Sequence, residues 1–326
     1  MSHNIKKAVS LYSYSEQWIS QENFTYEDMF RHLHGLGVHT LEIVGSQSFS
    51  QYPVIPENEV QELLALCKKY DMEFYCYDGY TDHGKIWNHD LTEEEILQEM
   101  TYDIMSAKRL GCKLMKSSIP APFLHRVLPI AEMFDIKLCV ELHAPEYPGN
   151  DHCQEYARTI KELNTDRIGL CPDFGMFILK PNEIMLDQYR QSGVPDEILD
   201  YIVANRFNGY TEETMWEKVQ SMGGDDNAHL AVSEMFGFLS WSRSADFEGL
   251  KSILPYCIYF HGKFYHIGDD CVETTIPYEE LLTMIAQSGY NGYIATEYEG
   301  HTFCLNDALE QIERHLQMED RILAAL

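Results

Sequence analysis

The stretch KLCVELHAP, residues 137–145, is an apolar run that ends in two polar side chains, Glu141 and His143. A parallel strand that is buried on both faces reads as a near-continuous apolar run of this kind. A carboxylate at the end of such a strand is unfavourable to bury unless it is paired or coordinates a cation. The stretch therefore predicts a buried strand with a functional group at its carboxyl end.

Three later stretches repeat this pattern, namely IGLCPDFGMF (168–177), LPYCIYFHGKFYHI (254–267) and GYIATEYEGH (292–301). Their strand-end polar residues are Asp173, His261 and Glu297. Three carboxylates and one imidazole suit a hard or borderline divalent cation such as Mn2+, Mg2+ or Co2+. We therefore predict that Glu141, Asp173, His261 and Glu297 bind one metal ion. The alternative is that they are four unrelated strand-end residues.

Strand-like and helix-like segments alternate along the whole chain. Four further strand candidates precede the stretches above, at residues 7–14, 40–45, 72–79 and 113–119. Eight units of one strand and one helix predict a (β/α)8 TIM barrel that occupies residues 1–326 as a single domain. An open doubly wound sheet is the alternative. It is weakened because no glycine-rich phosphate loop follows the first strand.

One connection is too long for a single crossover helix. About 80 residues separate the sixth strand candidate from the seventh, and an ordinary crossover needs far fewer. Helix-like patterns at 182–190 and 196–207 lie inside this interval. We predict that residues 176–253 form a helical insertion in the barrel. The insertion serves either as a lid and substrate wall or as a subunit contact, and both readings stay open.

The charge of the chain argues against several classes of partner. The sequence has 24 Lys and Arg against 52 Asp and Glu, for a formal net charge of −28. Such a charge repels phosphate backbones and anionic lipid surfaces. We expect the protein to bind neither nucleic acid nor membranes.

The cysteines and the apolar runs indicate the compartment. The nine cysteines are an odd number and contain no CxxC pair, which is typical of a reducing environment rather than a disulfide framework. The first ten residues lack the apolar core of a signal peptide, and no stretch is long and apolar enough to span a bilayer. We expect a cytoplasmic protein.

Alternation of side chains along a strand adds neighbours to the metal ligands. His143 should face the same way as Glu141, Lys263 the same way as His261, and Glu299 the same way as Glu297. Such a site suits proton removal beside a carbonyl, since a bound divalent ion stabilises the negative charge that develops on oxygen. The candidate bases are Glu141, Glu297 and His143.

The surrounding residues have more than one possible role. His143 acts either as the catalytic acid and base or as a residue that only orients Glu141. Lys263 either stabilises an oxyanion or pairs with an acidic neighbour. We place Glu299 and Tyr12 at the mouth of the barrel with Lys263 and His143, where they contact substrate.

The quartet Glu141, Asp173, His261 and Glu297 resembles the metal site of the xylose isomerase-like TIM-barrel superfamily of sugar isomerases, epimerases and dehydratases. The resemblance covers nearly the whole chain apart from the insertion. Two details depart from the ketose 3-epimerases. The fifth-strand Glu leads into Leu142-His143-Ala144-Pro145-Glu146 instead of an Asn-Arg-Phe-Glu type stretch, and Met176 stands where those enzymes have His.

The Glu-x-His fifth strand, the long insertion and the aromatic-rich mouth are similar to the catalytic α subunits of bacterial C-glycoside deglycosidases. This resemblance implies a bound Mn2+, with Mg2+, Co2+ and Zn2+ as alternatives, and a small β-rich partner subunit in an oligomer. It also implies a lyase that removes the proton beside the ketone of a 3-oxo-glucosyl C-glycoside and eliminates the aromatic aglycone.

Two other functions remain as alternatives. A sugar isomerase, ketose epimerase or keto-inositol dehydratase would use the same metal with Glu141 and Glu297 as paired bases. A barrel retained as a binding or scaffolding subunit would need no intact quartet.

Overall fold

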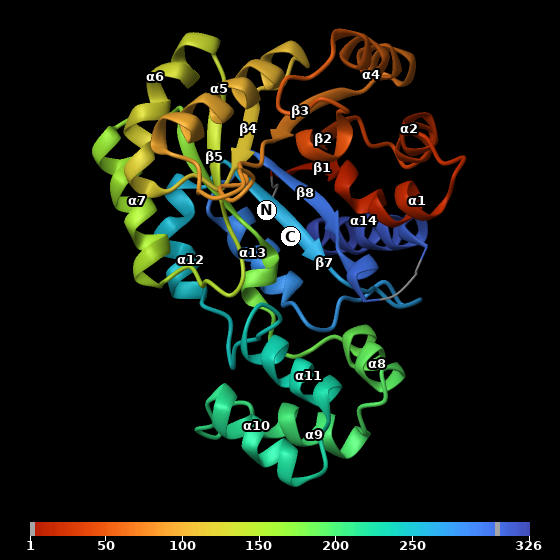
Figure 1. Cartoon of the computed structure of the whole chain (residues 1–326). Helices are drawn as coiled ribbons and strands as arrows, with labels where there is room; N and C mark the ends of the chain where they lie inside the picture. The colour runs from red at the N-terminus through yellow and green to blue at the C-terminus, as the bar shows by residue number, and fades with distance from the viewer. Residues whose placement is uncertain (1–3, 304–306) are drawn as a thin grey trace.

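The computed structural model describes residues 4–303 and 307–326 and shows a parallel β-sheet rolled into a nearly closed barrel, with helices packed around it (Figure 1). The predicted (β/α)8 barrel is confirmed. The eight strands are β1 (Lys6–Ser10), β2 (Thr40–Val44), β3 (Glu73–Asp78), β4 (Leu114–Ser117), β5 (Lys137–Leu142), β6 (Ile168–Pro172), β7 (Tyr259–Phe264) and β8 (Tyr293–Tyr298).

The barrel has one weak seam, between β6 and β7. The strands pair in the order β6-β5-β4-β3-β2-β1-β8-β7, all in parallel. Only two isolated bridges join β6 to β7 among the described residues, Leu170 with Cys257 and Asp173 with His261. The second bridge joins two of the predicted metal ligands, so these ligands lie where the barrel closes.

The helices follow the strands in the order that a TIM barrel requires. The segments after the first five strands contain α1 (Ser15–Ser20) and α2 (Tyr26–Gly35), α3 (Gly45–Ser48) and α4 (Glu57–Tyr70), α5 (Glu93–Arg109), α6 (Leu124–Phe134), and α7 (Asp151–Leu163). The segment after β6 contains α8 (Glu183–Gln191), α9 (Asp196–Asn205), α10 (Glu212–Ser221), α11 (Asp226–Phe236) and α12 (Phe247–Ile253). Helix α13 (Tyr278–Gln287) follows β7, and α14 (Ala308–Ala324) follows β8. The capping box that Thr92 forms with Glu95 starts α5.

The first strand is shorter than its apolar pattern predicts. The prediction of a strand over residues 7–14 is wrong in its second half, because residues Leu11–Tyr14 form a 3-10 helix. This turn places the Tyr14 ring in the core, where its hydroxyl lies 2.6 Å from His32 Nδ1 on α2. Burial of Tyr14 against α2 thus overrides the strand-like pattern of the sequence.

The interior of the barrel has two layers of different character. The lower layer holds mostly small side chains around the ring of Tyr259, and its members are Ala8, Cys76, Leu114, Cys139, Cys171, Tyr259 and Ala295. Two residues further along several of these strands, the side chains are polar, as at Asp78, Lys116, Glu141, His261 and Glu297. A packed apolar floor therefore lies beneath a polar layer at the carboxyl ends of the strands.

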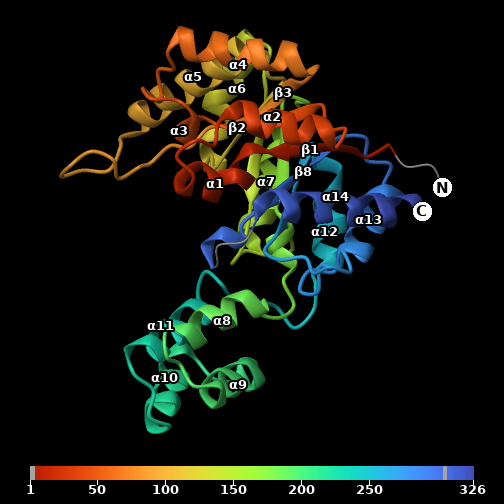
Figure 2. The same cartoon turned by 90° about the vertical axis from the view of Figure 1, so that its right-hand side faces the viewer.

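The long connection between β6 and β7 contains α8–α12. Helices α8–α11 lie apart from the helices around the sheet in both views (Figures 1 and 2). They pack on one another through a second hydrophobic core that includes Met185, Ile202, Met215 and Val232. We call α8–α11 the helical cluster. The bounds predicted for an insertion, 176–253, and its division from the barrel domain stay a prediction.

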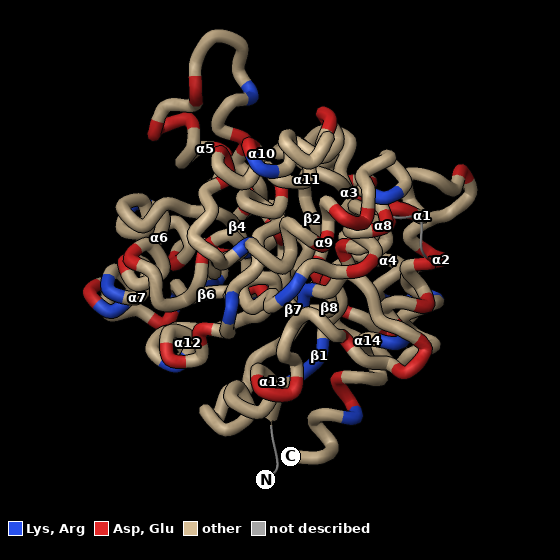
Figure 3. Tube along the Cα trace, turned by 90° about the horizontal axis from the view of Figure 1, so that it is seen from below, with Lys and Arg blue, Asp and Glu red and all other residues tan. Residues whose placement is uncertain are grey.

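Acidic positions outnumber basic ones along the chain, and the two kinds are interspersed (Figure 3). In the part of the chain that the structure describes, no helix is long and apolar enough to cross a membrane. The eight cysteines of that part are free thiols, and Cys304 lies outside it.

One buried carboxyl group, that of Glu319, lies 3.9 Å from a buried histidine, His315. Glu319 on α14 is almost fully buried, and neither of its carboxyl oxygens makes a hydrogen bond among the described residues. The nearest charged and titratable groups are Lys7, Asp320 and His315. Burial raises the pKa of Glu319 to about 8, and burial lowers the pKa of His315 to about 3. Both side chains are therefore neutral near pH 7.

This burial predicts a pH-dependent loss of stability that Glu319→Gln removes. The pKa of Glu319 is higher in the folded chain than in the unfolded chain, so its contribution is intact below about pH 4.5 and is lost as the pH rises toward 8. We expect the free energy of unfolding of Glu319→Gln to exceed that of the wild type by on the order of 2–4 kcal/mol at pH 8. At pH 5 the two should differ little. Urea denaturation at both pH values measures this, and a difference independent of pH would contradict it.

Candidate metal centre

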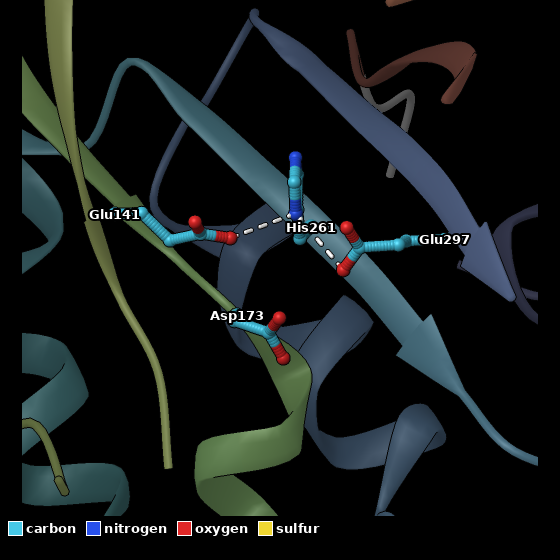
Figure 4. Close-up of side chains that lie close together, drawn as sticks. All are labelled: Glu141, Asp173, His261 and Glu297. Carbon is cyan, nitrogen blue, oxygen red and sulfur yellow. Dashed lines mark ion pairs between the residues drawn. The ribbon is translucent and has the colours of Figure 1, made fainter. Parts of the chain in front are cut away.

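The four predicted metal ligands come together at the carboxyl ends of β5–β8. Glu141, His261 and Glu297 lie on β5, β7 and β8, and Asp173 follows β6 directly. Figure 4 shows the four side chains pointing toward a common centre. One ligand atom from each lies within 4.8 Å of the others, so the group could hold a metal ion.

His261 is the centre of the group. Its Nδ1 atom lies 3.0 Å from Glu141 Oε1 and 3.0 Å from Glu297 Oε2 (Figure 4). Its other nitrogen, Nε2, lies 3.0 Å from Glu42 Oε2, on β2 across the barrel. In the tautomer that carries its proton on Nε2, the Nε2–H group donates to Glu42 and the lone pair of Nδ1 points toward the other carboxylates. A histidine that binds a metal through Nδ1 requires this tautomer.

Glu42 is a site residue that the sequence analysis missed. It is fully buried in the strand TLEIV, and His261 is its hydrogen-bond partner. Although burial raises the pKa of Glu42, the neighbouring His261 holds it below its usual value. The same signal that identified Glu141, a carboxylate in an apolar strand, could have identified Glu42.

The residues present fit a divalent cation. Within the described residues, His261 Nδ1, Asp173 Oδ2 and Glu297 Oε2 are buried and make no hydrogen bond. Each lies in an ion pair instead, with His261 Nδ1 3.0 Å from Glu297 Oε2 and Asp173 Oδ2 2.8 Å from Lys263 Nζ. Three carboxylates around one imidazole leave a surplus of negative charge that a cation would offset, and one nitrogen with three carboxylates is a donor set for a borderline ion.

Lys263 lies beside the ligands and pairs with them. Its Nζ lies 2.8 Å from Asp173 Oδ2, 3.2 Å from Glu299 Oε2 and 3.5 Å from Glu297 Oε2. Of the two roles considered for Lys263, ion pairing is the one that these distances describe. Gly175 leaves room for this arrangement, because a Cβ atom there would come within 2.8 Å of Asp173 Oδ1 and 3.2 Å of Lys263 Cδ.

A second lysine on the opposite side is another residue that the sequence analysis missed. Lys116 on β4 is buried, and its Nζ lies 2.7 Å from Glu141 Oε2 and 3.0 Å from Asp78 Oδ2. Burial raises the pKa of Asp78 to about 7. Lys116 therefore fixes the outer oxygen of Glu141 and leaves Oε1 directed at His261.

The protonation of the group reflects its surplus of carboxylates. Although burial lowers the pKa of His261, Glu297 and Glu42 together hold it well above its usual value. Burial raises the pKa of Asp173 to about 7. The group thus takes up protons to offset its negative charge, and a divalent cation would provide the same compensation.

The group opens into a cavity of about 370 Å3 at the mouth of the barrel. All four predicted substrate contacts, Tyr12, His143, Lys263 and Glu299, line this cavity. The Tyr12 hydroxyl lies 3.4 Å from Glu299 Oε1. His143 is the first residue after β5, and its exposed ring shares the cavity with Glu141, as alternation predicted. Their roles in binding or catalysis remain predictions.

The fold and the buried acidic group define a class of protein, the TIM barrels with a candidate metal site at the carboxyl ends of their strands. Residues 30–321 match the model of the xylose isomerase-like TIM barrel family, and the chain belongs to this family.

Two relatives with assigned activities are similar to the chain over most of its length. The chain is 27% identical to the 3'-dehydrocarminate deglycosidase alpha subunit of a Microbacterium species, over 98% of this chain and 95% of the relative. It is 23% identical to the C-glycoside deglycosidase alpha subunit of Microbacterium trichothecenolyticum, over 90% of this chain and 83% of the relative.

Solved structures of low identity share the fold. The IolI protein with a bound zinc atom is 13% identical, with a TM-score of 0.58 over 98% of this chain and 99% of that one. The 3-keto-D-glucoside 4-epimerase of E. coli is 14% identical, with a TM-score of 0.55 over 97% of this chain and 99% of that one.

The geometry predicts that Asp173→Asn weakens divalent-ion binding. Asn keeps the Oδ1 atom that accepts from Gly175 N–H but lacks the second carboxylate oxygen that faces the centre. We expect Mn2+ to raise the melting temperature of the wild type, and to bind Asp173→Asn at least about tenfold more weakly. Asp225→Asn, a change at the N-cap of α11, is the matched control. Equal Mn2+ affinity in all three proteins would contradict the site.

A second prediction concerns the residue behind His261. Glu42→Gln should lower the affinity for Mn2+ by roughly 10–100-fold, because the amide no longer holds the charge and tautomer of His261. Glu319→Gln is the matched control, since Glu319 is also buried but lies outside the site. Competition with a chelator of known affinity measures the change. If Glu42→Gln bound Mn2+ like the control, Glu42 would have no role in orienting the ligand.

Proposed function

We propose that the protein is a divalent-metal-dependent carbon–carbon lyase, the catalytic subunit of a C-glycoside deglycosidase. The observation that carries the proposal is the similarity to two deglycosidase alpha subunits over at least 90% of this chain, together with the buried Glu141-Asp173-His261-Glu297 group. The proposed substrate is a 3-oxo-glucosyl C-glycoside with an aromatic aglycone.

The proposed reaction begins with removal of the proton beside the ketone. The electron pair of the broken C–H bond forms a carbon–carbon double bond, the bond to the aglycone breaks, and the departing aglycone carbon takes up a proton. When bound, a divalent cation supplies polarisation of the ketone oxygen. Mn2+ is the proposed ion, with Mg2+, Co2+ and Zn2+ as alternatives.

We assign the proton transfer to His143. Its side chain lines the cavity and is not one of the four predicted ligands, and imidazole is the side chain that most often acts as a general acid or base. Glu141 and Glu297 are the alternative bases, but carboxylates that coordinate a cation hold protons weakly. Lys263, Glu299 and Tyr12 form the polar wall that orients the sugar hydroxyls, since each offers a donor or acceptor to the cavity.

The alpha-subunit names of the relatives support a partner subunit, and we infer that it is smaller and β-rich and that the two form an oligomeric complex. We also place the protein in the cytoplasm, because the eight cysteines of the described residues are free thiols. The helical cluster is either a wall over the site or a subunit contact. Phe238, which follows α11, lines the cavity and supports the first role.

A second candidate function is a sugar isomerase, epimerase or keto-inositol dehydratase. The observation in its favour is that Glu141 and Glu297 approach His261 Nδ1 from two sides at equal distances, 3.0 Å, as paired bases would around a substrate. Incubation with a 3-oxo-C-glucoside and, separately, with free ketoses separates the two functions. Release of the aglycone supports the lyase. Isomerised sugar without release of the aglycone would contradict the lyase and support the second function.

His143→Asn tests the assignment of the base. We expect the rate of aglycone release to fall by roughly 10²–10⁴-fold, because the main proton acceptor is lost, while the bound metal is unchanged. His152→Asn is the matched control, an exposed histidine on α7 that does not line the cavity. Steady-state rates and metal content of the three proteins are compared. Retained activity in His143→Asn would move the proton transfer to a carboxylate.

A further inference from the structure

The cavity of about 370 Å3 that opens from the predicted metal ligands is called the metal cavity below. A second cavity lies directly beside it. It encloses about 280 Å3 between the first two βα connections, and it is lined mainly by Leu11, Trp18, Ile19, Tyr26 and Met29. Tyr12, Val44 and Gln47 line both cavities and form the boundary between them. The two cavities are therefore adjacent parts of one mouth. We call the smaller one the apolar cavity.

The two cavities differ in chemistry. The metal cavity is lined by Asp78, Lys116, Glu141, Lys263, Glu297 and Glu299, all ionisable. No ionisable residue other than tyrosine lines the apolar cavity within the described chain, and its remaining polar side chains are Ser15, Gln47 and Ser48. A ligand that fits both has a hydroxyl-rich half and an apolar half joined by a short link.

The side chains at the outer rim of the apolar cavity are unusually exposed. Trp18 and Ile19 on α1 are 41% and 83% exposed. The Trp18 ring contacts the Tyr26 ring, with centroids 4.6 Å apart. Exposed apolar side chains that border a cavity mark a binding surface more often than isolated ones do. Flat rings of this kind stack well on aromatic ligands.

The apolar cavity also has room beyond it. Trp18, Tyr26, Gln47 and Ser48 line it and continue into an open groove of about 820 Å3 between α2 and α4. Drug-sized ligands occupy pockets of roughly 300–1,000 Å3. The metal cavity and the apolar cavity together provide space for a sugar joined to a ring system, and the groove accommodates a larger one.

We propose that the apolar cavity is the subsite for the aromatic aglycone. The inference rests on the proposed function, which places the sugar in the metal cavity. Tyr12 marks the junction of sugar and aglycone, because it lines both cavities and its hydroxyl lies 3.4 Å from Glu299 Oε1 in the metal cavity. Trp18 stacks on the aglycone, and Gln47 and Ser48 bind its phenolic hydroxyls.

Two other rings of the metal cavity mark the competing location. They belong to Tyr80 and Phe238, and both side chains are largely exposed. They border a cavity of charged side chains, whereas Trp18 and Ile19 border an apolar one. The apolar cavity is therefore the better site for a ring system, and Phe238→Ala tests the alternative.

The experiment uses the metal-loaded protein, with its second subunit if the two co-purify. We compare Trp18→Ala and Ile19→Ser with the wild type. The substrates are a 3-oxo-glucosyl flavone and methyl 3-oxo-glucoside, whose proton exchange beside the ketone is followed in D2O. We expect the KM for the flavone substrate to rise roughly three- to tenfold in Trp18→Ala, with the exchange rate of the methyl glucoside within about twofold of the wild type. Ile19→Ser, at a more exposed position, should change in the same direction.

The matched control is Trp87→Ala. Trp87 is 88% exposed on the connection between β3 and α5 and lines none of these cavities, so its loss should leave both substrates unaffected. Unchanged KM values in Trp18→Ala and Ile19→Ser, or a rise in Phe238→Ala alone, would overturn the apolar cavity as the subsite.

A direct binding measurement separates this inference from the proposed function. Calorimetry with the free flavone apigenin should give a dissociation constant roughly three- to tenfold higher for Trp18→Ala than for the wild type and for Trp87→Ala. If apigenin binds in this way but no aglycone is released by the wild type, the lyase assignment fails and the subsite stands. If aglycone is released but the variants bind apigenin equally, the subsite fails and the lyase assignment stands.

Discussion

The concentration of buried carboxylates around His261 is the constraint on which the rest of the structure depends. Glu141, Glu297 and Glu42 each lie 3.0 Å from one of its two nitrogens, and Asp173 completes the group. Isolated carboxylates are very unfavourable in such surroundings. Two buried lysines and the imidazole offset part of this charge, and a divalent cation would offset more.

The barrel provides this site by joining two kinds of layer. Small side chains and Tyr259 fill the lower interior, so the polar groups of the upper layer rest on a packed floor. The seam between β6 and β7 carries Asp173 and His261 in an isolated bridge, and the helical cluster leaves the sheet at the same seam. Phe238, two residues after the end of α11, lines the cavity beside the predicted ligands. The geometry of the site is therefore coupled to the closure of the barrel.

Much of this could be predicted from the sequence. The alternation of strands and helices predicted the barrel, and the four ligands could be recognised because each is a polar residue in an apolar strand. Glu42, Asp78 and Lys116 show the same pattern and could have been recognised in the same way. Which of them contact the four ligands could not be predicted, because a single strand does not reveal which polar residues meet across a barrel. The end of β1 at Ser10 depends on the burial of Tyr14. The apolar cavity depends on contacts between residues from separate elements, which no local pattern encodes.

The most direct test of the account is anomalous X-ray diffraction at the manganese edge from crystals of the protein grown with Mn2+. The account predicts a single strong peak between Glu141, Asp173, His261 and Glu297, with Glu42 still hydrogen-bonded to His261 Nε2. The absence of a peak among these four side chains, in crystals whose protein is folded as described, would contradict the central claim.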